Sequence, residues 1–161
     1  MERIGLLAHP PRDDHPRPGA LASTPPPSHP DPTGAGQGTP PGIMPAVLVV
    51  DDEAFIVDFL AILLEDEGFR VLRAYDGEQA WRLAQAEHPS LIISDVMMPR
   101  MTGLELLERL RSSGDGLARL PVILMSAVAR GTPRADAAFI PKPFDIERML
   151  SLVSRELAAV A

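Results

Sequence analysis

Apolar and polar positions alternate regularly from residue 46 to the end of the chain. Apolar runs predict strands at 47–50, 91–95 and 121–125, and their continuity is typical of strands buried on both faces of a sheet. Shorter segments at 69–74 and 138–140 predict two more strands. Amphipathic segments separate the strands, and this alternation predicts an α/β domain with a parallel sheet between two layers of helices.

The first predicted helix runs from about Ala54 to Glu67 and stops at Gly68, since glycine favours the left-handed conformation of a helix end. A second runs from Asp76 to about Glu87 and opens with a capping pattern, Asp76 followed three residues later by Gln79. The apolar face expected for the first helix consists of Phe55, Phe59, Ile62 and Leu63, and that of the second of Ala80, Leu83 and Ala84.

Two further helices are predicted. Thr102 and Glu105 form a capping pattern before a helix that carries Leu104, Leu107 and Leu110, and Asp145 caps a last helix ending near Ala159. Between Ser126 and Lys142, only about ten residues remain once the fifth strand and its turn are removed. That is too short for a crossover with a full helix, so the fourth helix of the alternating pattern is predicted to be a single turn or missing.

The first 44 residues differ from the rest of the chain in composition. Twelve of the eighteen prolines precede residue 46, and no apolar period is present there, so residues 1–44 are predicted to be disordered, beside a folded domain at 45–161. Pro25–Pro27 leave open a second interpretation, as a polyproline ligand for an aromatic groove. Met44 is an alternative natural start of the protein.

Charge and cysteine content narrow the class of protein. The net charge is −7 and falls mostly in the folded part, which argues against a general nucleic-acid surface. The absence of cysteine excludes both a disulfide framework and a thiolate metal site. No apolar stretch has the length of a membrane span and no secretory signal is recognisable, so a cytoplasmic protein without a membrane partner is expected.

Residues with metal-binding and phosphate-binding chemistry follow four of the predicted strands. Asp51 and Asp52 leave the first strand, Asp95 ends the third, Ser126 follows the fourth and Lys142 follows the fifth. In an open parallel sheet, the carboxyl ends of the strands form the edge where ligands bind. Three crowded carboxylates repel one another unless a cation holds them, and an all-oxygen ligand set with open positions favours Mg²⁺.

A carboxylate at such an edge can also attack phosphorus and form an aspartyl phosphate. This transfer requires positioning and charge neutralisation, which the cation and Lys142 would supply. Ser126 could donate a hydrogen bond to a phosphoryl oxygen, and Ala127 is small enough to leave access open. Taken singly, Asp52 could be a helix cap, Asp95 the start of a turn and Lys142 a surface lysine.

Four segments in order resemble the receiver domain of two-component response regulators. They are VLVVDDE at 47–53, LIISDVMMPRMTGLELL at 91–107, PVILMSA at 121–127 and FIPKPF at 139–144. The resemblance spans roughly residues 46–161 and implies a flavodoxin-like, doubly wound sheet of five parallel strands in the order 2-1-3-4-5.

The resemblance also implies roles for particular residues. Asp95 would be the phosphoacceptor, with Asp51, Asp52 and the backbone carbonyl of Met97 as its partners in holding Mg²⁺. Lys142 matches the active-site lysine, with a cis bond expected before Pro143. Ser126 stands at the hydroxyl position, and Phe139 stands at the aromatic switch position that moves inward when Ser126 turns toward the phosphoryl group.

The implied function is phosphorelay signalling, with a sensor histidine kinase or phosphotransfer protein as donor and an unknown downstream protein as target. No effector domain follows the last helix, so the resemblance implies a stand-alone regulator that is not an enzyme, apart from assisting its own phosphorylation and dephosphorylation.

The short fourth crossover leaves open a receiver-like interaction module that phosphate does not switch. A phosphatase of the haloacid dehalogenase type needs an aspartate two residues after its nucleophile, where this chain has Glu53 or Met97.

Overall fold

The structure, a computed structural model, describes residues 44–127 and 134–160. The segment predicted to be disordered, including Pro25–Pro27, lies outside these residues except for Met44. Among the helices that are described, none combines the length and apolar character needed to cross a bilayer.

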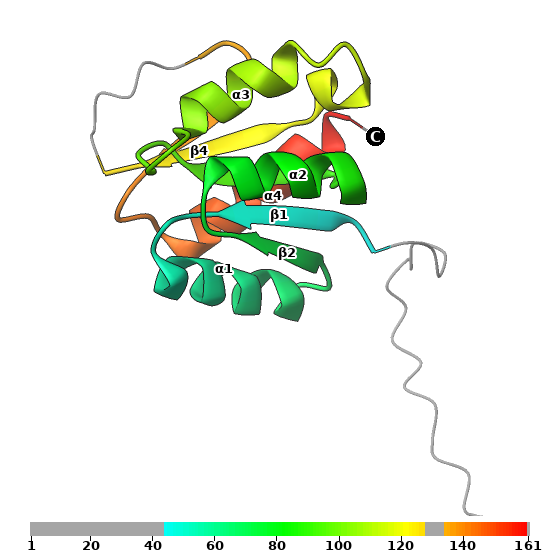
Figure 1. Ribbon diagram of the computed structural model, residues 1–161. Helices are drawn as coiled ribbons and strands as arrows, with labels where there is room; N and C mark the ends of the chain where they lie inside the picture. Colours follow the sequence, from blue (N-terminus) through cyan, green and yellow to red (C-terminus); the bar gives the residue numbers. More distant parts are fainter. Residues whose placement is uncertain (1–43, 128–133, 161) are drawn as a thin grey trace, which may run out of the picture. The chain divides into compact units, whose positions relative to one another are not determined.

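The sheet has five parallel strands in the order β2-β1-β3-β4-β5, as the sequence predicted (Figure 1). Every residue of β1, β3 and β4 is buried, whereas β2 and β5 lie at the edges and are partly exposed. The strands are β1 (Ala46–Val50), β2 (Arg70–Ala74), β3 (Leu91–Asp95), β4 (Val122–Ser126) and β5 (Ala138–Pro141).

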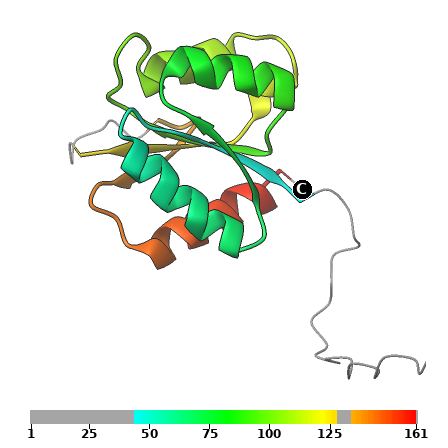
Figure 2. The same ribbon diagram turned by 60° about the horizontal axis from the view of Figure 1, so that its bottom comes forward.

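Helices cover both faces of the sheet (Figures 1 and 2). The elements are α1 (Ala54–Asp66), α2 (Gly77–Glu87), α3 (Gly103–Arg111), the short 3₁₀ helix η1 (Gly116–Arg119) and α4 (Ile146–Ala158). On one face, Leu60 and Leu64 of α1 share a core with Met149 and Val153 of α4. On the other face, α2 contributes mainly alanines and α3 contributes three leucines, Leu106, Leu107 and Leu110.

The predicted helix ends agree with the structure. Asp76 accepts a hydrogen bond from the Gln79 N–H at the start of α2, and Thr102 and Glu105 form a reciprocal capping box at the start of α3. Asp145 caps α4 in the same way, and Gly68 after α1 has a φ of 86°. These ends follow local chemistry, since a short polar side chain satisfies backbone N–H groups that lack a partner within the helix.

The apolar face predicted for α1 is wrong. Phe55 is 76% exposed and Ile62 58% exposed, whereas Val57, Leu60, Ala61 and Leu64 are fully buried. Both sets recur with helical spacing, so the period alone cannot decide which set faces the sheet. The same ambiguity affects α3, where Leu104 is exposed and Leu106 takes the buried position.

The connection between β4 and β5 is short, as predicted. The described residues contain four α-helices, and residues 134–137 form a turn that leads directly into β5. Residues 128–133 of this connection lie outside the described part of the chain.

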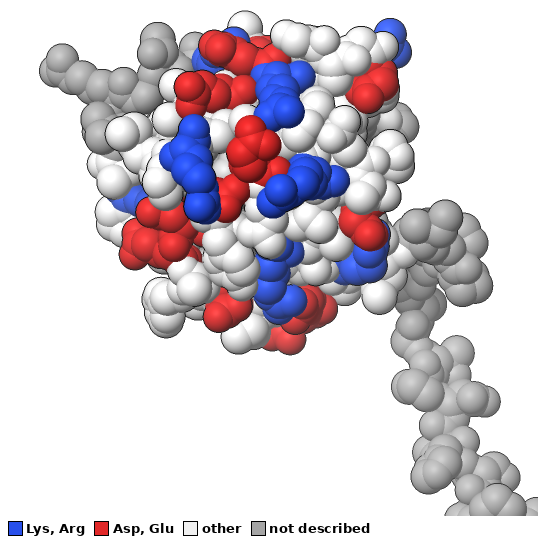
Figure 3. Space-filling view, viewed as in Figure 1, with Lys and Arg blue, Asp and Glu red and all other residues white. Residues whose placement is uncertain are grey.

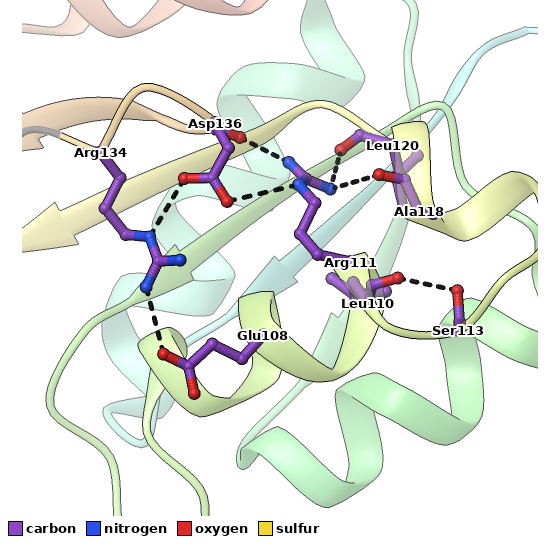
Figure 4. Close-up of polar contacts among 8 residues, drawn as sticks. All are labelled: Glu108, Leu110, Arg111, Ser113, Ala118, Leu120, Arg134 and Asp136. Atoms are coloured by element: carbon purple, nitrogen blue, oxygen red, sulfur yellow. Dashed lines mark hydrogen bonds and ion pairs between the residues drawn. The ribbon is translucent and has the colours of Figure 1, made fainter.

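An arginine network attaches this turn to α3 (Figure 4). Arg111 donates hydrogen bonds to the carbonyl oxygens of Ala118 (3.2 Å), Leu120 (2.9 Å) and Asp136 (2.6 Å). The Asp136 carboxylate accepts from Arg134 at 3.0 Å, and Arg134 also reaches Glu108 at 3.2 Å. Arg111 thus holds together α3, η1 and the turn before β5.

Charges of both signs are interspersed on the face shown in Figure 3. Arg109 of α3 pairs with Glu78 of α2 at 2.9 Å and lies 4.6 Å from the centre of the Trp81 ring. The Arg109–Glu78 ion pair therefore links the neighbouring helices α2 and α3.

Candidate functional site

Three aspartates lie together at the carboxyl edge of the sheet. Asp51 leaves β1 and is fully buried, Asp95 ends β3 and is 6% exposed, and the neighbouring Asp52 is exposed. Each can place a carboxylate oxygen within 4.8 Å of the other two. Because β1 and β3 are paired neighbours in the sheet, their last residues reach the same point.

Backbone N–H groups orient the two buried carboxylates. Asp51 accepts a hydrogen bond from the Glu53 N–H at 2.9 Å, and Asp95 accepts one from the Met97 N–H at 3.0 Å. Met97 itself has an exposed side chain, so the contribution of this residue to the site comes from its main chain.

Lys142 joins the two buried aspartates. Its ammonium lies 2.7 Å from Asp51 Oδ2 and 2.9 Å from Asp95 Oδ1. The Lys142 N–H donates to the carbonyl of Ser126 at 2.7 Å, and the peptide bond to Pro143 is cis. The lysine is thus attached to β4 through its main chain and to β1 and β3 through its side chain.

Burial and neighbouring charges shift the proton equilibria of this site. Burial raises the pKa of Asp95, and the hydrogen bond from Lys142 offsets only part of that effect. Burial alone would lower the pKa of Lys142, but its hydrogen bonds to Asp51 and Asp95 raise that pKa overall. Lys142 is therefore an ammonium at neutral pH, and the formal charge of the three aspartates together with this lysine is −2.

Ser126 and Phe139 lie on the neighbouring strands β4 and β5, and Ala127 directly follows β4. Ser126 is 2% exposed at the end of β4, while Ala127 directly after it is exposed. Phe139 pairs in register with Leu124, and alternation along β4 places the Ser126 side chain on the same face as Leu124. Ser126 and the half-buried Phe139 therefore share the sheet face that α2 and α3 cover in part.

An apolar groove beside Lys142 was missed by the sequence interpretation. Phe55, Ile56 and Phe59 of α1 line it opposite Pro143 and Phe144, and Ala127 completes it. The rings of Phe55 and Phe59 stack with centroids 6.3 Å apart. The sequence did contain a signal, because α1 carries more large apolar residues than one buried face requires.

A five-stranded parallel sheet with an aspartate cluster and a lysine at its carboxyl edge defines a doubly wound α/β domain with a polar site at the strand ends. Residues 47–154 match the family model of the response regulator receiver domain, and the chain belongs to this family.

Relatives and solved structures agree with this assignment. The response regulator GtcR of Aneurinibacillus migulanus is 36% identical over 118 residues, which cover 69% of this chain and 47% of GtcR. Chemotaxis response regulator CheY4 of Vibrio cholerae superposes with a TM-score of 0.65 at 30% identity, covering 71% of this chain and 99% of CheY4. Response regulator TrrA of Thermotoga maritima was solved in complex with Mg²⁺-BeF. It superposes with a TM-score of 0.63 at 27% identity, and the superposition covers 70% of this chain and 99% of TrrA. The chain spans about half the length of the curated relatives it matches.

Proposed function

We propose that this receiver domain accepts a phosphoryl group on Asp95 from a phosphohistidine of a sensor histidine kinase or phosphotransfer protein. The observation that carries the proposal is the contact of 2.9 Å between the Lys142 ammonium and Asp95 Oδ1, inside a cluster of three aspartates. A cation beside a nucleophilic carboxylate lowers the repulsion that an incoming phosphoryl group experiences.

Asp51, Asp52 and Asp95 fit a magnesium ion, and with the Met97 carbonyl they would form its protein ligands. The donor set consists of oxygen alone, and its formal charge of −2 with Lys142 matches a divalent cation. When bound, Mg²⁺ would neutralise charge on the phosphoryl oxygens. The complex of TrrA with Mg²⁺-BeF supports this assignment by similarity.

The transfer balances with the groups at hand. The bond between phosphorus and the histidine nitrogen breaks, a bond between phosphorus and a carboxylate oxygen of Asp95 forms, and the leaving imidazole takes a proton from solvent. Asp51 holds Lys142 in place at 2.7 Å, so the ammonium remains beside Asp95 throughout. Ala127 is exposed, which leaves the donor access to the site.

Ser126 and Phe139 would report the phosphoryl group to the outside of the domain. In this proposal the Ser126 hydroxyl donates a hydrogen bond to a phosphoryl oxygen, and Phe139 then moves inward on the same sheet face. Their placement on adjacent strands and the partial exposure of Phe139 support the pairing. The partly exposed Phe139 surface would bind the downstream protein.

The domain is proposed to be a phosphoacceptor and not an enzyme, assisting only its own phosphorylation and dephosphorylation. Family membership leaves the haloacid dehalogenase alternative without support. For the domain as a whole we propose a cytoplasmic signalling role that is exerted through protein partners and not through nucleic acid.

The test is phosphorylation of the purified protein by a small phosphodonor such as phosphoramidate with Mg²⁺, followed by intact mass spectrometry. One phosphate is expected, and none with EDTA or in Asp95→Asn. Asp58→Asn, a change at an exposed aspartate of α1, serves as the control and should accept phosphate like the wild type. Equal labelling of Asp95→Asn would contradict the assignment.

A second measurement tests the alternative of an interaction module that phosphate does not switch. Backbone NMR shifts that stay unchanged on addition of beryllofluoride and Mg²⁺ would favour that alternative.

A further inference from the structure

We infer that Asp76 and Arg100 are a positioning pair that holds the β3–α3 loop against the β2–α2 turn and so keeps the Met97 main chain directed at the phosphoacceptor. The inference rests on the proposed function, because Met97 is a proposed metal ligand. The hydrogen bonds and ion pair of the Asp76 and Arg100 side chains involve Gln79 and each other, not the aspartate cluster, so their effect would pass through the loop.

Arg100 is held in an unusual backbone conformation. Its φ of 68° lies in the left-handed region, which residues with a Cβ rarely adopt. Its guanidinium forms an ion pair with Asp76 Oδ2. A residue stays in this region only when surrounding contacts compensate for the strain, and the ion pair is such a contact.

Asp76 is a well-defined partner for this arginine. Its side chain is 14% exposed, and Oδ1 accepts the Gln79 N–H at 2.8 Å as the cap of α2. The cap and Arg100 both lower the pKa of Asp76, so its carboxylate is charged at neutral pH. The two oxygens thus have separate partners, one within α2 and one on the loop.

Two close packing contacts stand beside the ion pair. A Cβ added at Gly77 would lie 2.6 Å from Met101 Cβ, so the turn and the loop touch directly next to Asp76 and Arg100. At the end of the loop, a Cβ at Gly103 would lie 2.2 Å from the carbonyl oxygen of Asp95. The Gly103 N–H also donates to the Val96 carbonyl at 2.9 Å.

These contacts leave the backbone of residues 97–100 as the adjustable part of the loop. Met97 donates its N–H to Asp95 Oδ2 at 3.0 Å, only three residues before Arg100. Release of Arg100 would allow its backbone to leave the left-handed region, and the change in direction would reach Met97. Asp76 and Arg100 therefore act on the phosphorylation site by limiting the conformations of this loop.

Two substitutions remove the pair in different ways. Asp76→Asn keeps an oxygen to cap α2 but loses the charge that binds Arg100. Arg100→Gly removes the guanidinium, but glycine adopts a positive φ without strain. An effect of this variant therefore comes from the lost ion pair and not from backbone strain at position 100. Glu78→Gln is the matched control, because it breaks the ion pair of 2.9 Å between α2 and α3 without touching the loop.

Amide hydrogen exchange at Met97, measured without Mg²⁺, and the dissociation constant for Mg²⁺, measured by calorimetry, are the readouts. Asp76→Asn and Arg100→Gly should each speed exchange at Met97 several-fold and weaken Mg²⁺ binding by about tenfold, the lower end for residues that orient metal ligands. The double variant should resemble either single variant, because both remove one interaction. Glu78→Gln should match the wild type in both measurements.

The inference is overturned if both single variants keep wild-type exchange at Met97 and wild-type Mg²⁺ affinity, including the case in which only their melting temperature falls. It is also overturned if Glu78→Gln produces the same changes. Failure of the wild type to bind Mg²⁺ or accept phosphate would instead reject the proposed function, while exchange at Met97 would still test the pair.

Discussion

The Lys142 ammonium lies 2.7 Å from the buried carboxylate of Asp51, although 91 positions separate the two residues in the chain. The same ammonium lies 2.9 Å from Asp95, so one cation contacts two carboxylates from neighbouring strands. The site still holds excess negative charge, and its stability should depend on each charged group in a predictable direction.

Replacing Lys142 with methionine should destabilise the metal-free domain. Asp51 would remain fully buried beside Asp95 without its ammonium partner, and an unpaired buried charge is costly. We expect a loss of about 1–3 kcal/mol in the free energy of unfolding, measured by urea denaturation in EDTA. Arg148→Met, at an exposed position of α4, is the control. Equal stability of the two variants would show that Lys142 does not stabilise Asp51.

Asp95→Asn should make the metal-free domain more stable at pH 7. Burial raises the pKa of Asp95, so the folded state binds this proton more tightly than the unfolded state does. The stabilisation from this proton is present at low pH and is lost as the pH rises through the folded-state pKa. The melting temperature of Asp95→Asn should therefore exceed that of the wild type at pH 7, and the gap should close below the ordinary value of 3.8. A gap that stays constant with pH would contradict this explanation.

Two substitutions in α1 test which of its faces is buried. Leu60 is fully buried, so Leu60→Ala should cost about 2–5 kcal/mol. Phe55 is 76% exposed, so Phe55→Ser should change the free energy of unfolding by only about 0.5 kcal/mol. Chemical denaturation measures the loss of unfolding free energy in each variant. A larger loss in Phe55→Ser than in Leu60→Ala would support the buried face predicted from the sequence.

Arg111→Lys should weaken the attachment of the turn before β5. A lysine keeps the charge but lacks the planar fork that reaches the carbonyls of Leu120 and Asp136 together. We expect a loss of about 1–3 kcal/mol in the free energy of unfolding, with faster amide exchange in β5. Arg119→Lys, at an exposed position of η1, should have almost no effect. Similar losses in both variants would assign the effect to charge or packing in general.

The strands, the helix caps and the aspartate cluster were predictable from the sequence. Asp76, Thr102 and Asp145 cap helices because each satisfies N–H groups within three residues of itself. Asp51 and Asp95 could be placed together because parallel strands present their carboxyl ends at one edge.

The sequence by itself thus determined the order of elements, the parallel sheet and the set of acids at its edge, since short-range periods and strand direction decide these features. Only the tertiary structure decided that Phe55 and Phe59 face a groove, that Arg100 meets Asp76 and that Arg111 binds the turn at Asp136. Each of these contacts joins different elements, and it depends on how a helix is rotated or where a loop passes. Several rotations and loop paths are compatible with one apolar pattern, and only packing of the whole domain selects among them.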